Sequence, residues 1–192
     1  MRFSLRACLI DQSNGAMEPE LLAEYLETLG IPLTIIKLSD VPDHEGTRRT
    51  LPCSLCANMR RGILANSAKE LGCGVIALGH HKDDAAETVL MNLFYGGRFK
   101  CFHPHLYMSR TGIRVIRPFV YVEERRIRLE AERLALPVIS SCCPYGDKSK
   151  RKSTKEIVAS LEKEIPELKS NIAHALKHLR ENESWPEGML NE

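Results

Sequence analysis

The residues best suited to chemistry form one continuous run, Gly79-His80-His81-Lys82-Asp83-Asp84, and Glu87 follows three positions later. The run comes after a short apolar stretch and begins a helical pattern, which is where open α/β sheets bind ligands and anions. Carboxylates there are natural Mg²⁺ ligands, and a histidine can stabilise a phosphate or transfer a proton. The alternative interpretation is that Asp83 and Asp84 only cap the helix and complement its dipole.

Seven cysteines are many for 192 residues, and four of them are grouped. Cys53 and Cys56 form a C-x-x-C motif, and Cys142-Cys143 stand directly before Pro144. A C-x-x-C is compatible with a redox dithiol, half of a zinc site or part of an iron–sulfur site. No second C-x-x-C follows at a zinc-ribbon spacing, and three cysteines suit a cluster with one open iron.

Three groups of basic residues could meet an anion. Arg60-Arg61 follow the C-x-x-C, Arg117 ends an apolar strand pattern, and five basic residues lie between positions 148 and 155. A strand-end arginine can clamp an anion, and clustered lysines can contact phosphates. Each group also has a plain interpretation, as solvated surface or, for Arg117, as a side chain that reaches water.

An alternation of strands and helices must position these residues. The apolar pattern predicts strands at 3–10, 33–38 and 74–78, helices at 19–29, 55–71 and 83–94, a loop at 41–52, a hairpin of 106–108 with 112–116, and later helices at 122–134, 153–161 and 168–179. The wholly apolar segment 74–78 is typical of the centre of a parallel sheet. The alternation as a whole predicts an α/β fold with a doubly wound parallel sheet.

The composition excludes several classes of protein. The chain is 43% hydrophobic and 27% charged, which is typical of a globular domain and not of a disordered chain. Its longest apolar runs are a few residues, far below the roughly 20 that a membrane span needs, so we expect a cytoplasmic protein with no membrane partner. The net charge of +2 is too small to indicate a nucleic-acid-binding protein by itself.

Several motifs occur together in the order of one known family. They are Cys53-x-x-Cys56, Arg60-Arg61-Gly62-Ile63-Leu64, the run from Ala77 to Thr88, Met91-Asn92-Leu93-Phe94-Tyr95-Gly96-Gly97 and Ile116-Arg117-Pro118. From about Phe3 to Leu179 the chain resembles the tRNA 2-thiocytidine synthetase family of PP-loop (N-type) ATP pyrophosphatases. The resemblance implies a Rossmann-like fold, of the adenine nucleotide alpha hydrolase type, with a small C-terminal helical extension.

The activity that the resemblance implies is a reaction in two halves. ATP adenylates the C2 oxygen of a cytidine in the tRNA anticodon loop and releases pyrophosphate. A sulfur atom then displaces AMP, which gives 2-thiocytidine. The implied partners are tRNA and a sulfur donor such as a cysteine desulfurase, and the implied assembly is a homodimer.

The resemblance also assigns roles to individual residues. The expected catalytic residues are Asp83, Asp84, His80 and Arg117, and the expected ATP contacts are Asp11, Gly79, His80, His81 and Glu87. The expected metal ligands are Asp84 for Mg²⁺, and Cys53, Cys56 and Cys143 for a 4Fe-4S cluster, with Cys142 as the alternative third ligand and zinc as the alternative occupant. The expected RNA contacts are Arg60, Arg61, Lys150, Arg151 and Lys152.

One family motif is missing from the chain. The family begins with a strand and a Ser-Gly-Gly-x-Asp-Ser loop that holds the ATP phosphates, and no such loop occurs here. We therefore expect an N-terminally incomplete α/β domain over 1–145, a helical extension over 146–181, a tail over 182–192, and weak ATP binding or none. The alternative functions are those of a degenerate paralogue that binds RNA or a cluster, and of a PP-loop sulfur or amide transferase with another substrate.

Overall fold

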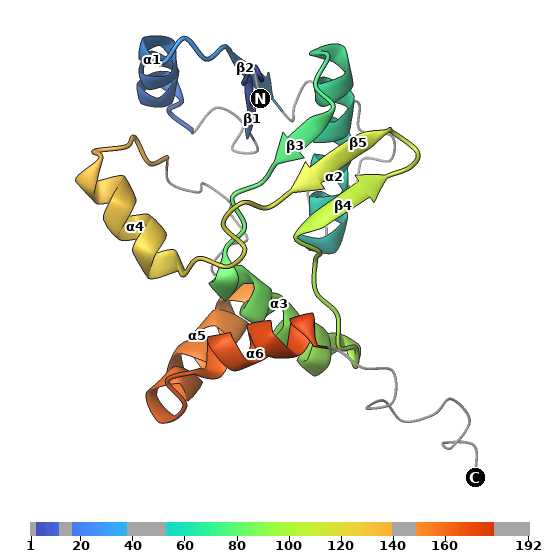
Figure 1. Ribbon diagram of the computed structural model, residues 1–192, viewed down its shortest axis with the longest axis vertical. Helices are drawn as coiled ribbons and strands as arrows, with labels where there is room; N and C mark the ends of the chain where they lie inside the picture. The colour runs from blue at the N-terminus through green and yellow to red at the C-terminus, as the bar shows by residue number, and fades with distance from the viewer. Residues whose placement is uncertain (1–2, 12–16, 38–52, 140–148, 179–192) are drawn as a thin grey trace.

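Figure 1 shows the computed structural model, which describes residues 3–11, 17–37, 53–139 and 149–178. In chain order its elements are β1 (Ala7–Asp11), α1 (Glu20–Thr28), β2 (Leu33–Lys37), α2 (Cys53–Glu70), β3 (Val75–Ala77), α3 (Lys82–Gly96), β4 (His105–Met108), β5 (Ile113–Ile116), α4 (Glu124–Arg133), α5 (Lys150–Glu164) and α6 (Leu168–Lys177). The predicted order of strands and helices is confirmed. The predictions for the loop at 41–52, for Cys142-Cys143 and for the tail at 182–192 fall outside the described residues.

The strands form two sheets among the described residues. β1 and β2 pair in parallel with α1 as the crossover, which is the connection that parallel strands require. β5 lies between β3, which is parallel to it, and β4, which is antiparallel. The predicted hairpin is confirmed: β4 turns into β5 through Gly112, whose φ of +71° favours glycine.

Helix α2 connects the two sheets by contacting β1, β3 and β5 (Figure 1). Its buried side chains, Ala65, Ser67 and Ala68, are small, so the helix can approach the strands closely. The helix begins at Cys53, two residues earlier than predicted. The C-x-x-C therefore occupies the first turn of α2 and does not precede the helix.

β3 differs from the prediction for the strand at 74–78. In the described residues it is an edge strand that pairs with β5 alone, and Val75 is 48% exposed. The apolar sequence predicts a central strand because it assumes a neighbour on both sides.

Helices α5 and α6 pack against α3 (Figure 1). The contact buries mostly small side chains, of which Ala86, Val89, Thr154 and Val158 are each at most 2% exposed. Helix α5 begins at Lys150, three residues before the predicted start. No helix in the described part of the chain is long and apolar enough to cross a membrane.

Candidate active site at the start of α3

The acidic motif begins α3, directly after β3. His81 is the N-cap: its Nδ1 accepts a hydrogen bond from the Asp84 N–H at 3.3 Å, and the His81 N–H donates to Asp84 Oδ2 at 2.9 Å. This reciprocal pair is a capping box. Asp84 Oδ2 thus takes part in capping α3, as the plain interpretation predicts. The other oxygen, Oδ1, pairs with the guanidinium of Arg151.

Asp83 is buried and connects three helices. Its Oδ2 accepts the Glu124 N–H at the start of α4 at 2.8 Å, and its Oδ1 pairs with Lys169 Nζ of α6 at 2.5 Å. Burial is the largest influence on the pKa of Asp83 and acts to raise it, but the hydrogen bonds from Lys169 and Glu124, with the charge of Lys169, leave that pKa lowered. Both carboxylate oxygens of Asp83 are thus engaged by other parts of the protein.

Arg151 of α5 contacts the carboxylates of both Asp84 and Glu87. Its Nη2 donates to Asp84 Oδ1, and its Nε donates to Glu87 Oε2 at 3.4 Å. Glu87 is only 4% exposed, and burial raises the pKa of its carboxyl although Arg151 acts to lower it. Because Arg151 already occupies Asp84 Oδ1, a divalent cation that binds Asp84 would have to share the Asp84 carboxylate with Arg151 or displace the arginine.

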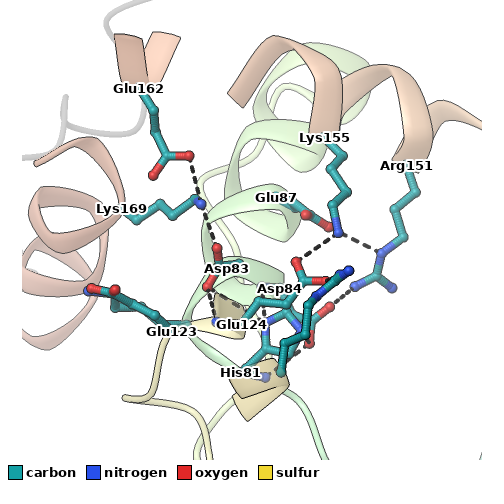
Figure 2. A network of polar contacts seen from close by, with 12 residues as sticks. His81, Asp83, Asp84, Glu87, Glu123, Glu124, Arg151, Lys155, Glu162 and Lys169 are labelled. Carbon is teal, nitrogen blue, oxygen red and sulfur yellow. Dashed lines mark hydrogen bonds and ion pairs between the residues drawn. The ribbon is translucent and has the colours of Figure 1, made fainter. Parts of the chain in front are cut away.

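Two more ion pairs extend the network between the helices (Figure 2). Lys155 of α5 donates to Glu124 Oε2 at 2.8 Å, and Lys169 also pairs with Glu162 at 2.7 Å. A helix dipole disfavours positive charges in the first turn, where Lys150, Arg151 and Lys152 of α5 lie. Asp84 and Glu87 of α3 offset that cost at Arg151, and the pair of Lys155 with Glu124 of α4 adds a second contact that holds α5 against the site.

His80 and Arg117 both lie against the ring of Phe102. The ring centroids of His80 and Phe102 are 4.8 Å apart, and the Arg117 Cζ lies 4.8 Å from the Phe102 centroid. The Leu78 N–H donates to the Ile116 carbonyl at 3.0 Å, which keeps the ends of β3 and β5 side by side. His80 of the acidic motif and Arg117 of the Ile-Arg-Pro motif are thus brought together around one ring.

Two polar atoms of this pair are buried without a hydrogen-bond partner within the described residues, His80 Nδ1 and Arg117 Nε. Burial lowers the pKa of His80, and the charges of Arg117, Arg151 and Arg60 lower it further, while Asp84 raises it. The lowered pKa favours the neutral imidazole of His80, which can accept a hydrogen bond at one nitrogen and donate one at the other. Such unsatisfied groups are suited to receive a ligand.

The first turns of α2 lie close enough to this site to act on its charges. Burial is the main cause of the lowered pKa of Arg117, and the charge of Arg61 lowers it further. The charge of Arg60 likewise lowers the pKa of His80. Arg60 and Arg61 follow the half-buried Cys56 within two turns of the helix, so the C-x-x-C segment and the acidic motif flank one region.

The other predicted site residues lie in varied places. Asp11 ends β1 and is buried, in a different sheet from the strand that leads to His80. A Cβ added at Gly79 would meet no atom within 4 Å. Lys150 lies over the ring of Tyr95 at 4.7 Å, and the Lys152 N–H donates to the N-cap Ser149 at 3.2 Å.

Metal binding gains no direct support from the described side chains. Among them, no group of three or more histidine, cysteine, aspartate or glutamate residues is arranged to hold a metal ion. Cys142 and Cys143, of which one is the expected third cluster ligand, lie outside the described residues. The Mg²⁺ site at Asp84 and the cluster site remain predictions.

Sequence reasoning missed the partners that complete the site. Lys169, Lys155 and Glu124 join the network, and Phe102 contacts His80 and Arg117. Lys169 lies 86 positions after Asp83 in the chain, so no local spacing predicts their contact. The only signal was the excess of basic residues in the C-terminal helices, which suggested RNA binding and which the structure partly pairs with carboxylates.

Comparisons with known proteins identify the relatives of this chain. A family model described as a PP-loop domain matches residues 5–136. Relatives named tRNA-cytidine(32) 2-sulfurtransferase are 37% identical in Alkalilimnicola ehrlichii and 34% identical in Geobacter metallireducens, each over 94% of this chain. The chain spans 58% of the first relative's length and 72% of the second's.

A solved structure shares the fold. The chain is similar to the U34-tRNA thiolase NcsA from Methanococcus maripaludis with its [4Fe-4S] cluster, with a TM-score of 0.72 and 27% identity over 92% of this chain and 63% of that one. The likeness includes the Rossmann-like arrangement of parallel strands and covering helices. This chain belongs to the PP-loop family, in the branch that contains the tRNA-cytidine(32) 2-sulfurtransferases.

Proposed function

We propose that this protein takes part in the ATP-dependent thiolation of a tRNA cytidine at its C2 position. The observation that carries the proposal is a contact: helix α2, which bears the C-x-x-C, packs against β3 and β5, the strands that lead to His80 and Arg117. Sulfur chemistry and nucleotide chemistry would then share one region, as a reaction in two halves needs. ATP would activate the C2 oxygen with loss of pyrophosphate, and sulfur would then replace AMP.

The donor set suits a 4Fe-4S cluster. Positions 53 and 56 both fall in the first turn of α2. A helix N-terminus and nearby arginines favour thiolates. Cys53 and Cys56, with Cys143 or Cys142, would hold the cluster, which when bound supplies an open iron for sulfur; zinc is the alternative occupant.

The residues around α3 would handle the nucleotide. Asp84 has one carboxylate oxygen that already binds a cation, Arg151, so Mg²⁺ with bound phosphates could take that place. Asp83 would hold α3 in position through Lys169 and Glu124. Neutral His80 and buried Arg117 present unsatisfied nitrogens that could bind an oxygen of ATP or of the cytidine. Asp11, Gly79, His81 and Glu87 remain the other proposed ATP contacts.

The proposed partners follow from the same reaction. The RNA is tRNA, with the cytidine at position 32 favoured because the curated relatives at 34–37% identity carry that name. The solved thiolase that acts on U34 is 27% identical, so a uridine is the second candidate. A cysteine desulfurase as sulfur donor, a homodimer and a cytoplasmic location complete the proposal.

A genetic experiment tests this function directly. The gene is deleted in its own organism, and nucleosides from total tRNA are measured by mass spectrometry. We expect 2-thiocytidine to disappear and to return with the wild-type gene but not with a Cys56→Ser gene. Unchanged 2-thiocytidine in the deletion strain would contradict the proposal, and loss of a thiolated uridine instead would support the second candidate.

A further inference from the structure

One stretch of the chain has an unusual composition. Residues 88–122 contain no aspartate or glutamate, five arginine or lysine residues, and seven of the chain's eleven aromatic residues. Six of these aromatic side chains are 43–57% exposed, namely Phe94, Tyr95, Phe99, Tyr107, Phe119 and Tyr121. Exposed rings among positive charges are typical of surfaces that bind single-stranded nucleic acid.

Part of this stretch lines a cavity of about 350 Å³ between α3 and α6. Its wall includes the rings of Phe99, Phe102 and Tyr121 and the side chains of Lys100 and Lys177, and none of its lining residues is acidic. Lys177 Nζ lies 4.2 Å from the Tyr121 ring centroid, at the edge of the cavity. Ligand pockets typically measure roughly 300–1,000 Å³, so the size suits one small flat group.

The cavity wall is held in place from both sides. The Lys100 carbonyl accepts a hydrogen bond from Asn92 Nδ2 of α3 at 2.7 Å, and Cys101 Sγ donates to the Ala85 carbonyl at 3.6 Å. On the other side Arg117 Nη1 donates to the His103 carbonyl at 2.5 Å. A wall fixed in this way loses little conformational entropy when a ligand binds.

Phe102 joins the cavity to the candidate active site. Its ring lines the cavity and also contacts His80 and Arg117, the two residues with unsatisfied buried nitrogens. A group bound in the cavity would therefore be the immediate neighbour of a group bound at His80. Two neighbouring binding places, one in the cavity and one at His80, suit two successive nucleotides of an RNA strand better than they suit a single small molecule.

We propose that this cavity, the Phe99–Tyr121 pocket, binds one unpaired base of the RNA substrate, next to the nucleotide that is modified. The inference rests on the proposed function, because it takes the substrate to be the loop of a tRNA. Unpaired loop bases can be splayed out and stacked on aromatic rings, and Lys100 and Lys177 are placed to meet the phosphates that flank the base. The pocket would select for a loop and against a duplex.

The test uses the full chain and a stem–loop RNA that carries 2-aminopurine at each unpaired position in turn. We expect one loop position to lose fluorescence in the complex, because stacking quenches this base. Phe99→Ala and Tyr121→Ala should each weaken binding roughly 5- to 150-fold, since stacking contributes about 1–3 kcal/mol per base. They should also restore the fluorescence, and Phe99→Leu should give an intermediate loss.

Matched controls separate the pocket from the surface around it. Phe94→Ala removes a ring of similar exposure in the same acid-free stretch but outside the pocket, and should bind RNA like the wild type. Lys177→Gln should reduce the salt slope of binding by about 0.7, whereas Lys163→Gln on exposed α5 should not change it. Melting temperatures check that each variant is folded.

The outcomes distinguish this inference from the proposed function. Wild-type protein that binds no stem–loop RNA would contradict the proposed function, and the pocket assignment with it. Wild-type binding with pocket variants that behave like Phe94→Ala, or with no quenched loop position, would overturn the pocket assignment and leave thiolation standing.

Discussion

The contact of Lys169 with Asp83 gives the sharpest prediction about stability. Lys169→Met removes the ammonium and keeps a side chain of similar length. Asp83 would remain buried, with its side chain 7% exposed, and would keep the Glu124 N–H as a hydrogen-bond donor and His81 Nδ1 at 3.8 Å from its Oδ2. Breaking a buried ion pair by removing one partner costs roughly 3–5 kcal/mol, and because the Lys169 side chain is 19% exposed we expect about 3 kcal/mol, the low end.

The pH dependence identifies the cause of that loss. In the wild type the pKa of Asp83 is lowered, so its ion pair stabilises the fold above the unfolded pKa of about 3.9, and this stability is lost as the pH falls through the folded pKa. Burial acts to raise the pKa of Asp83 and Lys169 acts to lower it, so this pKa rises when Lys169 is removed. The loss of unfolding free energy in Lys169→Met should therefore be largest near neutral pH and should shrink as the Asp83 carboxyl becomes protonated.

Urea denaturation at a series of pH values measures this deficit. Lys163→Met, an exposed lysine on the neighbouring helix, is the matched control and should change the free energy of unfolding by less than about 0.5 kcal/mol. A Lys169→Met loss as small as that of the control, or a loss that does not change with pH, would refute the reasoning that Asp83 is a buried, charged anchor.

Three further predictions concern the same region. Asp84→Asn should keep the fold, because the amide oxygen of asparagine can still accept the His81 N–H of the capping box, but should abolish in a calorimetric titration the weak Mg²⁺-dependent ATP binding expected of this chain; unchanged binding would limit Asp84 to capping. Glu87→Gln should leave the free energy of unfolding unchanged or raise it slightly near neutral pH, because burial raises the pKa of Glu87 and so makes its charged form unfavourable in the folded protein. In the same urea series this gain in unfolding free energy should vanish below about pH 4.3, where the carboxyl is protonated in both states. A large loss of unfolding free energy would contradict this. Replacing Lys150 and Lys152 by glutamine should weaken tRNA binding and lower its salt slope by somewhat less than one unit per lost phosphate contact in filter-binding assays, without changing which tRNA is preferred; an unchanged slope would leave these lysines as solvated surface.

The features that could be predicted from sequence are those set by neighbouring residues. The strand before Gly79, the helix after His81 and the hairpin around Gly112 follow from apolar periodicity and turn chemistry. The meeting of His80 with Arg117 was also within reach, because parallel strands bring their carboxyl ends to one edge.

The features that could not be predicted depend on contacts between distant parts of the chain. The sequence predicts a helix from position 153, whereas α5 begins at Lys150, because the carboxylates of α3 offset the positive charge that Arg151 brings to its first turn. Asp83 and Asp84 are equivalent in the sequence, and only the fold shows that Lys169 of α6 pairs with the first and Arg151 of α5 with the second. The exposed edge of β3 likewise depends on which strands lie beside it.

The central claim is that sulfur reaches the RNA by way of a cluster held at the start of α2. The most direct test is the iron and acid-labile sulfide content of the protein purified without oxygen, compared with Cys56→Ser and with Cys8→Ser, a half-buried cysteine in β1. The account predicts oxygen-sensitive iron and sulfide in a 4:4 ratio, about four of each per chain, in the wild type and in Cys8→Ser, and a loss of both in Cys56→Ser. Stoichiometric zinc without iron after anaerobic reconstitution would contradict it.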